Sequence, residues 1–293
     1  MKKVVNFLKY KYIAAAFSAG LFVLFIIGTV ILGGFNFGID FVGGIKIIAQ
    51  FEEGVSEKEI RDVLSDFNPQ VQQIGGGNQN DYIISTKLND PRNENNEVDT
   101  LKKVLHSRYA ETKFLSEEAV GSAIGDILKT SALKLMGIAL IFMAIYLIFR
   151  FELKYAFSVM VSLIHDMVLT FLFIGFTGTE INIPVVAALL TIFGYTVNDK
   201  IVVFDRIREN VQFETKLTFL DLINKSISQS MSRTLLTSLT TLFAAATLYF
   251  IGGKVLNDFA KVLIFGIIIG TYSSIYIASP LLVVWEKIAG RKK

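Results

Sequence analysis

The chain alternates long apolar runs with polar segments, and six of the apolar runs are long enough to cross a lipid bilayer. A membrane-spanning helix needs about 20 consecutive, mostly apolar residues. The runs cover approximately residues 13–32, 133–149, 155–176, 183–204, 235–251 and 259–285. The pattern therefore predicts an α-helical polytopic membrane protein with six transmembrane helices.

The segment between the first two runs has a different, mixed pattern. Residues 42–51 alternate as a strand does, and residues 56–67 predict a helix because Ser56 and Glu59 have the spacing of a capping box. The remaining predicted elements are strands at 71–74 and 82–87 around a Gly-Gly-Gly-Asn turn at 75–78, a helix at 98–109 and a strand that begins at 113–115. The order β-α-β-β-α-β predicts a small ferredoxin-like α+β domain.

These patterns divide the chain into three regions. Residues 1–33 contain the N-terminus and the first transmembrane helix, residues 34–130 form an extracytoplasmic α+β domain, and residues 131–293 form a five-helix transmembrane domain. Residues 121–130 predict a helical lead into the second span, and residues 213–232 predict an amphipathic helix at the membrane surface before the fifth. The first apolar run lacks a clear cleavage pattern, so we expect an uncleaved helix rather than a signal peptide.

The placement of lysine and arginine predicts the orientation of the helices. Short cytoplasmic segments are enriched in these residues relative to outer loops. With the N-terminus inside, the two short outer loops contain only Lys254, with Lys261 at a helix start. The inner segments contain Lys2, Lys3, Lys9, Lys11, Arg150, Lys154, Arg206, Arg208, Lys216, Lys225, Arg233, Lys287, Arg291, Lys292 and Lys293. We therefore expect a multi-pass membrane protein with both termini in the cytoplasm.

Composition agrees with a membrane protein and excludes several kinds of site. The chain is 52% hydrophobic and 19% charged, whereas a soluble domain carries about 25% charged residues. It has no cysteine, and its two histidines, His106 and His165, lie in different regions. We therefore expect no disulfide, cofactor or metal site. The net charge of +3 is too small to indicate nucleic-acid binding, and no phosphate-binding glycine loop for ATP is present.

Ionisable and polar side chains interrupt three of the predicted spans. His165 and Asp166 lie near the middle of the third span, and Asn198 and Asp199 lie in the fourth. Arg233 opens the fifth span. A charge at the bilayer centre costs about 3 kcal/mol on insertion scales, and such residues commonly serve ion or substrate movement. Helical spacing adds Thr191 and Tyr195 to the face of Asn198, with Asp199 beside it. It also places Thr237 and Thr241 on the face of Arg233, which Ser238 and Thr240 broaden.

Two interpretations of these residues are open. In one, Asp199 takes up a proton from one side of the membrane and releases it to the other. In the alternative, Asp199 is a structural ion-pair partner of Lys200 or Arg233; Lys200 then holds Asp199 ionised, unless its side chain snorkels away. His165 and Asp166 belong either to the same proton path or to an interhelical hydrogen-bond anchor. Asp205 and Arg206 lie at the cytoplasmic end of the fourth span, where interface anchoring explains them.

Four short blocks occur in order along this layout. The first is the glycine-rich segment after the first span, with Gly38, Asp40, Gly43 and Gly44. The others are residues 163–166, residues 194–210 and residues 233–241. Together they resemble the SecD/SecF family of protein-export membrane proteins, in the resistance-nodulation-division superfamily, over nearly the whole chain.

The resemblance implies a non-enzymatic subunit of the bacterial Sec protein-export machinery. Members of the family pair with SecD and use the proton motive force to assist preprotein translocation across the cytoplasmic membrane, after ATP-driven passage through the SecYEG channel. The partners it implies are SecD, the SecYEG channel, the translocating preprotein, YajC and protons. It also implies that Asp199 is the proton-relay carboxylate and Arg233 its basic neighbour. We group Tyr195, Asn198, His165 and Asp166 with them as coupling residues.

Two other functions compete with this one. An intramembrane aspartyl protease would use Asp166 and Asp199 as a carboxylate pair that shares a proton. The Gly-x-Gly-Asp pattern expected of such a protease is absent, and Lys200 disfavours a shared proton. A proton-coupled small-molecule or lipid exporter of the same superfamily is the second alternative, and with six spans such a protein would have to dimerise.

Overall fold

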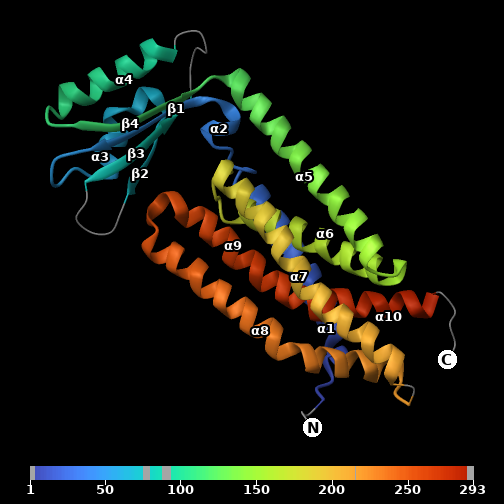
Figure 1. Cartoon of the computed structure of the whole chain (residues 1–293). Coiled ribbons are helices and arrows are strands. Elements are labelled where there is room, and N and C mark those ends of the chain that lie inside the picture. Colours follow the sequence, from blue (N-terminus) through green and yellow to red (C-terminus); the bar gives the residue numbers. More distant parts are fainter. Residues whose placement is uncertain (1–3, 75–79, 88–93, 215, 289–293) are drawn as a thin grey trace.

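A bundle of long helices carries a small sheet domain at one end (Figure 1). The computed structural model describes residues 4–74, 80–87, 94–214 and 216–288. Six helical segments in this described part are long and apolar enough to cross a membrane. The prediction of a polytopic helical membrane protein is therefore confirmed. The Gly-Gly-Gly-Asn turn and the terminal residues Lys2, Lys3, Arg291, Lys292 and Lys293 lie outside the described residues.

The helices extend beyond the apolar runs that predicted them. Helix α1 covers Lys11–Ile31, α5 Ser122–Arg150, α6 Leu153–Phe176, α7 Ile183–Phe213 and α8 Phe219–Ile251. The predicted lead at 121–130 is the first part of α5, and the predicted surface helix at 213–232 is not separate, because α8 runs through most of it without a break. Hydropathy marks the part of a helix inside the bilayer, and backbone hydrogen bonds continue past it until a cap ends them.

The last span changes its helical geometry part-way. Helix α9 covers Gly253–Ser273, a π-helical turn η3 covers Ser274–Ala278, and α10 covers Ser279–Ile288. Single π turns inside α-helices are rare and are often found at functional sites. The turn follows directly on Ser273, which belongs to the polar network described below.

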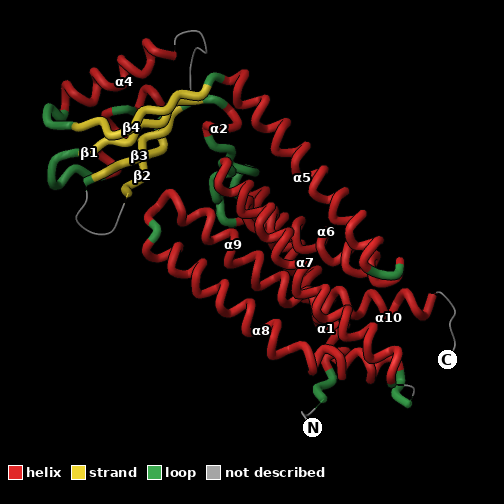
Figure 2. Tube along the Cα trace, in the orientation of Figure 1, coloured by secondary structure: helices red, strands yellow, loops and turns green. Residues whose placement is uncertain are grey.

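Helices α6, α7 and α9 form the buried centre of the bundle, while α5 lies at its edge (Figure 2). Half of the 18-residue apolar stretch of α7 is buried inside the structure, compared with 6% of the corresponding stretch of α5. Two glycines on α9 permit close packing, because an added Cβ would lie 2.4 Å from Ile192 at Gly266 and 2.1 Å from Thr196 at Gly270. The spacing Gly-x-x-x-Gly is typical of tightly packed membrane helices.

The sheet domain has four antiparallel strands in the order β2-β3-β1-β4. The strands are β1 Gly44–Gln50, β2 Gln70–Ile74, β3 Asp81–Thr86 and β4 Lys113–Val120. Helix α3 (Glu57–Val63) begins with the predicted Ser56 and Glu59 capping box, a 3-10 turn η2 (Ser65–Phe67) follows it, and α4 (Glu94–Arg108) is the second long element. Apolar residues of β1, α3 and α4, including Ile47, Ile60 and Leu101, form the domain core. The predicted strand–helix order is therefore present.

The glycine-rich segment joins the sheet domain to the helices. Gly38 N donates to Ile181 O at 2.8 Å, and Asp40 in α2 (Ile39–Val42) accepts from the backbone N of Ile183, the first residue of α7, at 2.8 Å. Gly43 has a φ of 78°, which L side chains rarely adopt. At Gly44 an added Cβ would lie 2.5 Å from the carbonyl oxygen of Thr86. The glycines are thus required by backbone geometry.

Candidate functional site

Asp199 lies near the middle of α7 and is 2% exposed. Its carboxylate accepts two hydroxyl hydrogen bonds from α8, from Ser238 Oγ to Oδ2 at 3.1 Å and from Thr237 Oγ1 to Oδ1 at 3.4 Å. No ion pair of Asp199 occurs among the described residues. The ion pair with Lys200 or Arg233 that the structural alternative requires is not present among these residues.

Lys200, the next residue, faces the other way. Successive helical positions point about 100° apart. The Lys200 side chain is fully buried, and its Nζ lies 2.6 Å from Asp166 Oδ2 on α6 and 3.5 Å from the carbonyl oxygen of Thr196. The side chain therefore neither snorkels nor pairs with Asp199; it neutralises Asp166.

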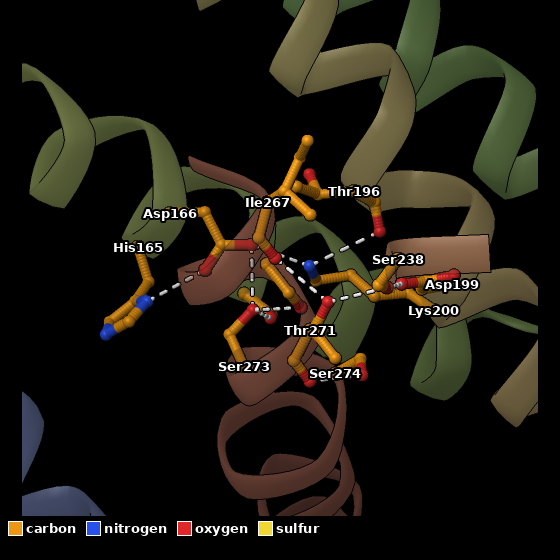
Figure 3. A network of polar contacts seen from close by, with 12 residues as sticks. His165, Asp166, Thr196, Asp199, Lys200, Ser238, Ile267, Thr271, Ser273 and Ser274 are labelled. Carbon is orange, nitrogen blue, oxygen red and sulfur yellow. Dashed lines mark hydrogen bonds and ion pairs between the residues drawn. The ribbon is translucent and has the colours of Figure 1, made fainter. Parts of the chain in front are cut away.

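Asp166 collects three partners from three helices (Figure 3). Besides Lys200, Ser273 Oγ on α9 donates to Oδ2 at 2.7 Å, and His165 Nδ1 lies 3.0 Å from Oδ1. The chain of contacts continues from His165 Nε2 to Ser18 Oγ on α1 at 3.2 Å, and from Ser18 to the Tyr272 hydroxyl at 3.1 Å. These contacts have the geometry of the interhelical hydrogen-bond anchor, and membership of the proton path stays a prediction.

Asp166, Asp199, Lys200 and Ser238 form a buried polar layer across the bundle. Four buried hydroxyls near this layer have no hydrogen-bond partner among the described residues. They belong to Thr170, Tyr195, Thr196 and Thr234. Each lies four positions from a residue of the layer on its own helix: Asp166, Asp199, Lys200 and Ser238 respectively. Buried polar groups are normally paired, so the site has hydrogen-bonding capacity to spare on both sides of the carboxylates.

The other predicted residues lie outside this network of contacts. Asn198 and Arg233 are exposed, and the Arg233 side chain makes no hydrogen bond or ion pair among the described residues. Asp205 pairs with Arg150 at 2.5 Å, and Arg206 contacts Gln229 and Glu209, all near the cytoplasmic ends that the sequence predicts. The sequence analysis grouped Arg233 with Asp199, but no hydrogen bond joins these two side chains in the structure.

Sequence reasoning missed the contribution of the last span. Thr271 Oγ1 lies 2.8 Å from Ser238 Oγ, and Ser273 bonds Asp166, yet both residues sit in a run whose hydropathy marked it only as a long span. The available signal was Gly266 and Gly270, whose spacing places α9 against α7. Within the described chain, no group of three or more His, Asp or Glu side chains is arranged to hold a metal ion.

The contacts disfavour an aspartyl-protease pair. A shared proton requires two carboxylates in direct contact. Asp166 is occupied by an ammonium and a serine, and Asp199 by two hydroxyls from another helix. Hydroxyl partners can donate to a carboxylate and accept from a carboxylic acid, so Asp199 can be hydrogen-bonded in either protonation state.

Comparison with known proteins identifies the family. The family model "Protein export membrane protein SecD/SecF, C-terminal" matches residues 100–288, and the model "SecD/SecF GG Motif" matches residues 31–55. The chain belongs to the SecD/SecF family. The SecD/SecF glycine motif contains Gly38, Asp40, Gly43 and Gly44, the residues that join the sheet domain to α7.

Individual SecD/SecF proteins match over nearly the whole chain. "Protein translocase subunit SecF" of Desulfurispirillum indicum is 37% identical and aligns over 96% of this chain and 92% of its own length. The SecF subunit of Rickettsia prowazekii is 34% identical over 98% of this chain and 93% of its own. Such proteins are named as translocase subunits rather than enzymes, and the exporter and protease alternatives gain no support.

A solved structure shows the same SecD/SecF architecture. The crystal structure of SecDF from Thermus thermophilus, described as a translocon-associated membrane protein, matches with a TM-score of 0.80 and 34% identity over 98% of this chain. This chain spans only 39% of that larger chain.

Proposed function

We propose that this chain is the SecF-type half of a SecD–SecF pair that uses the proton motive force to help move preprotein outward after its passage through SecYEG. The full-length similarity to SecF subunits supports this assignment. We further propose that the sheet domain, with its β-α-β-β-α-β order, is ferredoxin-like and extracytoplasmic, and that both termini are cytoplasmic. Protons and preprotein are then its working partners, with YajC as an accessory one.

An exposed polar face on α7 and α8 supports the pairing with SecD. Thr191, Asn198, Arg233 and Thr240 are all exposed in the single chain, although they lie in membrane-spanning helices. Polar side chains in such helices normally face a protein interior rather than lipid. A partner bundle that covers this face would enclose Asn198 and Arg233 next to the Asp199 layer.

Asp199 is the residue that we propose carries the proton. The observation that supports this role is a buried carboxylate that has no ion-pair partner in the described part of the chain. Hydroxyls from a neighbouring helix hold it, and buried hydroxyls with free hydrogen-bonding capacity lie nearby. Arg233 and Asn198 on the exposed face and the buried Tyr195 hydroxyl complete the relay. His165 and Asp166 serve it through the Lys200 ion pair.

The test is completion of preprotein translocation into inverted vesicles that lack the native protein and contain SecD with either wild type or Asp199→Asn. ATP is removed midway and a proton gradient is then imposed. Wild type should finish the crossing, and Asp199→Asn should stall while still copurifying with SecD. Asp205→Asn, on the same helix but at its cytoplasmic end, is the matched control and should finish. An Asp199→Asn protein that finishes as wild type does would refute the relay.

A further inference from the structure

Ser238 stands between two acceptors on two other helices. Its side chain on α8 is 3% exposed. Its Oγ lies 3.1 Å from Asp199 Oδ2 on α7 and 2.8 Å from Thr271 Oγ1 on α9 (Figure 3). The residue therefore links the candidate proton carrier to the last span through one hydroxyl group.

Each hydroxyl has one proton to place. Thr271 Oγ1 can donate its own proton to the carbonyl oxygen of Ile267 at 2.9 Å, and in its contact with Ser238 either hydroxyl can be the donor. Ser238 has one proton and two neighbouring acceptors, Asp199 and Thr271. It can satisfy only one of them at a time.

The protonation state of Asp199 decides which acceptor Ser238 serves. When Asp199 is a carboxylate, it can only accept, so Ser238 donates to it and has no proton left to donate to Thr271. When Asp199 is a carboxylic acid, its hydroxyl donates to Ser238, and Ser238 turns its own proton to Thr271. No proton leaves Ser238 in this exchange; its hydroxyl only rotates.

Thr237, the other partner of Asp199, is not constrained in this way. Its hydroxyl also lies 3.0 Å from the carbonyl oxygens of Arg233 and Thr234 in its own helix. The proton of Thr237 therefore has acceptors within α8 whatever the state of Asp199. Ser238 makes no such contact among the described residues, and its two partners lie on α7 and α9.

We propose that Ser238 is a positioning residue whose hydroxyl reverses when Asp199 gains or loses a proton, so that Ser238 donates to Thr271, from α8 to α9, only in the protonated state. This inference rests on the proposed function of Asp199. The reversal acts next to the π-helical turn of the last span, because Ser274 Oγ donates to the carbonyl oxygen of Thr271 at 2.8 Å. The protonation state of Asp199 on α7 thereby changes the hydrogen bonding of Thr271 on α9.

Infrared difference spectroscopy of the SecD complex in proteoliposomes, titrated with pH, tests the reversal without requiring transport. The signal is the carboxylic-acid carbonyl band that disappears in Asp199→Asn. Thr271→Val is close in shape and removes the acceptor used only in the protonated state, so the band should appear at lower pH, by about half a pH unit. Ser238→Ala removes the donor to the carboxylate, and a hydrogen bond to a charged group is the stronger one, so the band should appear at higher pH.

Two further variants make the result specific. Thr237→Val should shift the band upward by less than Ser238→Ala does, because its contact with Asp199 is longer, and Ser238→Thr should keep the wild-type midpoint. Shifts of Thr271→Val and Ser238→Ala in the same direction, or no shift with Thr271→Val, would overturn the reversal, as would the absence of any band that depends on Asp199. Full translocation by Asp199→Asn would instead refute the relay and leave opposite infrared shifts standing.

Discussion

Lys200 Nζ lies 2.6 Å from Asp166 Oδ2, so the cation that follows Asp199 in the sequence neutralises a carboxylate on a different helix. Both side chains are at most 1% exposed. The pair separates the roles of the two carboxylates: Asp166 is held in an ion pair, and the partners of Asp199 among the described residues are hydroxyls.

Removing the cation alone should destabilise the bundle. Lys200→Met leaves Asp166 buried without its counter-charge, and breaking one partner of a buried pair costs about 3–5 kcal/mol. We expect a lower unfolding temperature in detergent, measured by near-ultraviolet circular dichroism. The double variant Lys200→Met with Asp166→Leu should recover most of the loss, because apolar replacement of both partners removes the uncompensated charge. Equal destabilisation in both variants would contradict this account.

Glu180 should make the junction between the sheet domain and the helices sensitive to pH. It lies between α6 and α7 and lines a cavity of about 350 Å³ under the glycine-rich segment. Burial raises the pKa of this carboxyl above its ordinary value of 4.5, while Lys46 opposes the shift and Asp258 and Asp40 add to it. The folded protein thus binds this proton more tightly than the unfolded chain does, so the contribution of Glu180 to stability is fully present below pH 4.5 and is lost as pH rises through the raised pKa.

Glu180→Gln removes this dependence. At neutral pH the variant should unfold at the same or a higher temperature than wild type, and the difference should vanish at acid pH. Thermal unfolding of both proteins across the pH range measures it, and Glu53→Gln, an exposed carboxylate of the sheet domain, is the control. Lower stability of Glu180→Gln at neutral pH would contradict the expected cost of burying the charge.

The glycine motif should tolerate no side chain at Gly44. An alanine Cβ there meets the backbone oxygen of Thr86 at 2.5 Å, and backbone cannot move aside cheaply. Gly44→Ala should therefore lower the stability of the sheet domain by about 1–3 kcal/mol. Gly20→Ala in α1, where an added Cβ meets nothing within 4 Å, is the matched control. Protease sensitivity of the sheet domain should rise only in the first variant.

Close packing of α9 against α7 should depend on Gly270. An alanine Cβ there would lie 2.1 Å from Thr196 Cγ2, so the two helices must move apart and Thr271 and Ser273 with them. We expect Gly270→Ala to reduce the free energy of unfolding and to reduce the rate of gradient-driven translocation by at least as large a fraction. Gly137→Ala on α5, where nothing lies within 4 Å, should leave both unchanged. Wild-type translocation by Gly270→Ala would show that this packing is not needed.

The sequence predicted the elements well and the partners poorly. Apolar runs and the Ser56–Glu59 capping box are local signals, so six spans and the order of the sheet domain could be predicted from them. The partner of Lys200 could not be predicted from the sequence, because it depends on where α6 lies relative to α7. Lys200 is one position from Asp199, so the two side chains point in different directions around α7. Thr271 and Ser273 were hidden in an apolar run, since a hydropathy average does not report isolated hydroxyls.

The joint between Asp40 and the first residue of α7 has a mechanical consequence. Asp40 holds the backbone of Ile183, and only Gly43 separates α2 from the first strand of the sheet domain. No flexible linker lies between the N-terminal end of α7 and the base of the domain at this point. A displacement of that end must either break these bonds or carry the start of β1 with it. Movement of the helix that contains Asp199 is therefore coupled to movement of the sheet domain.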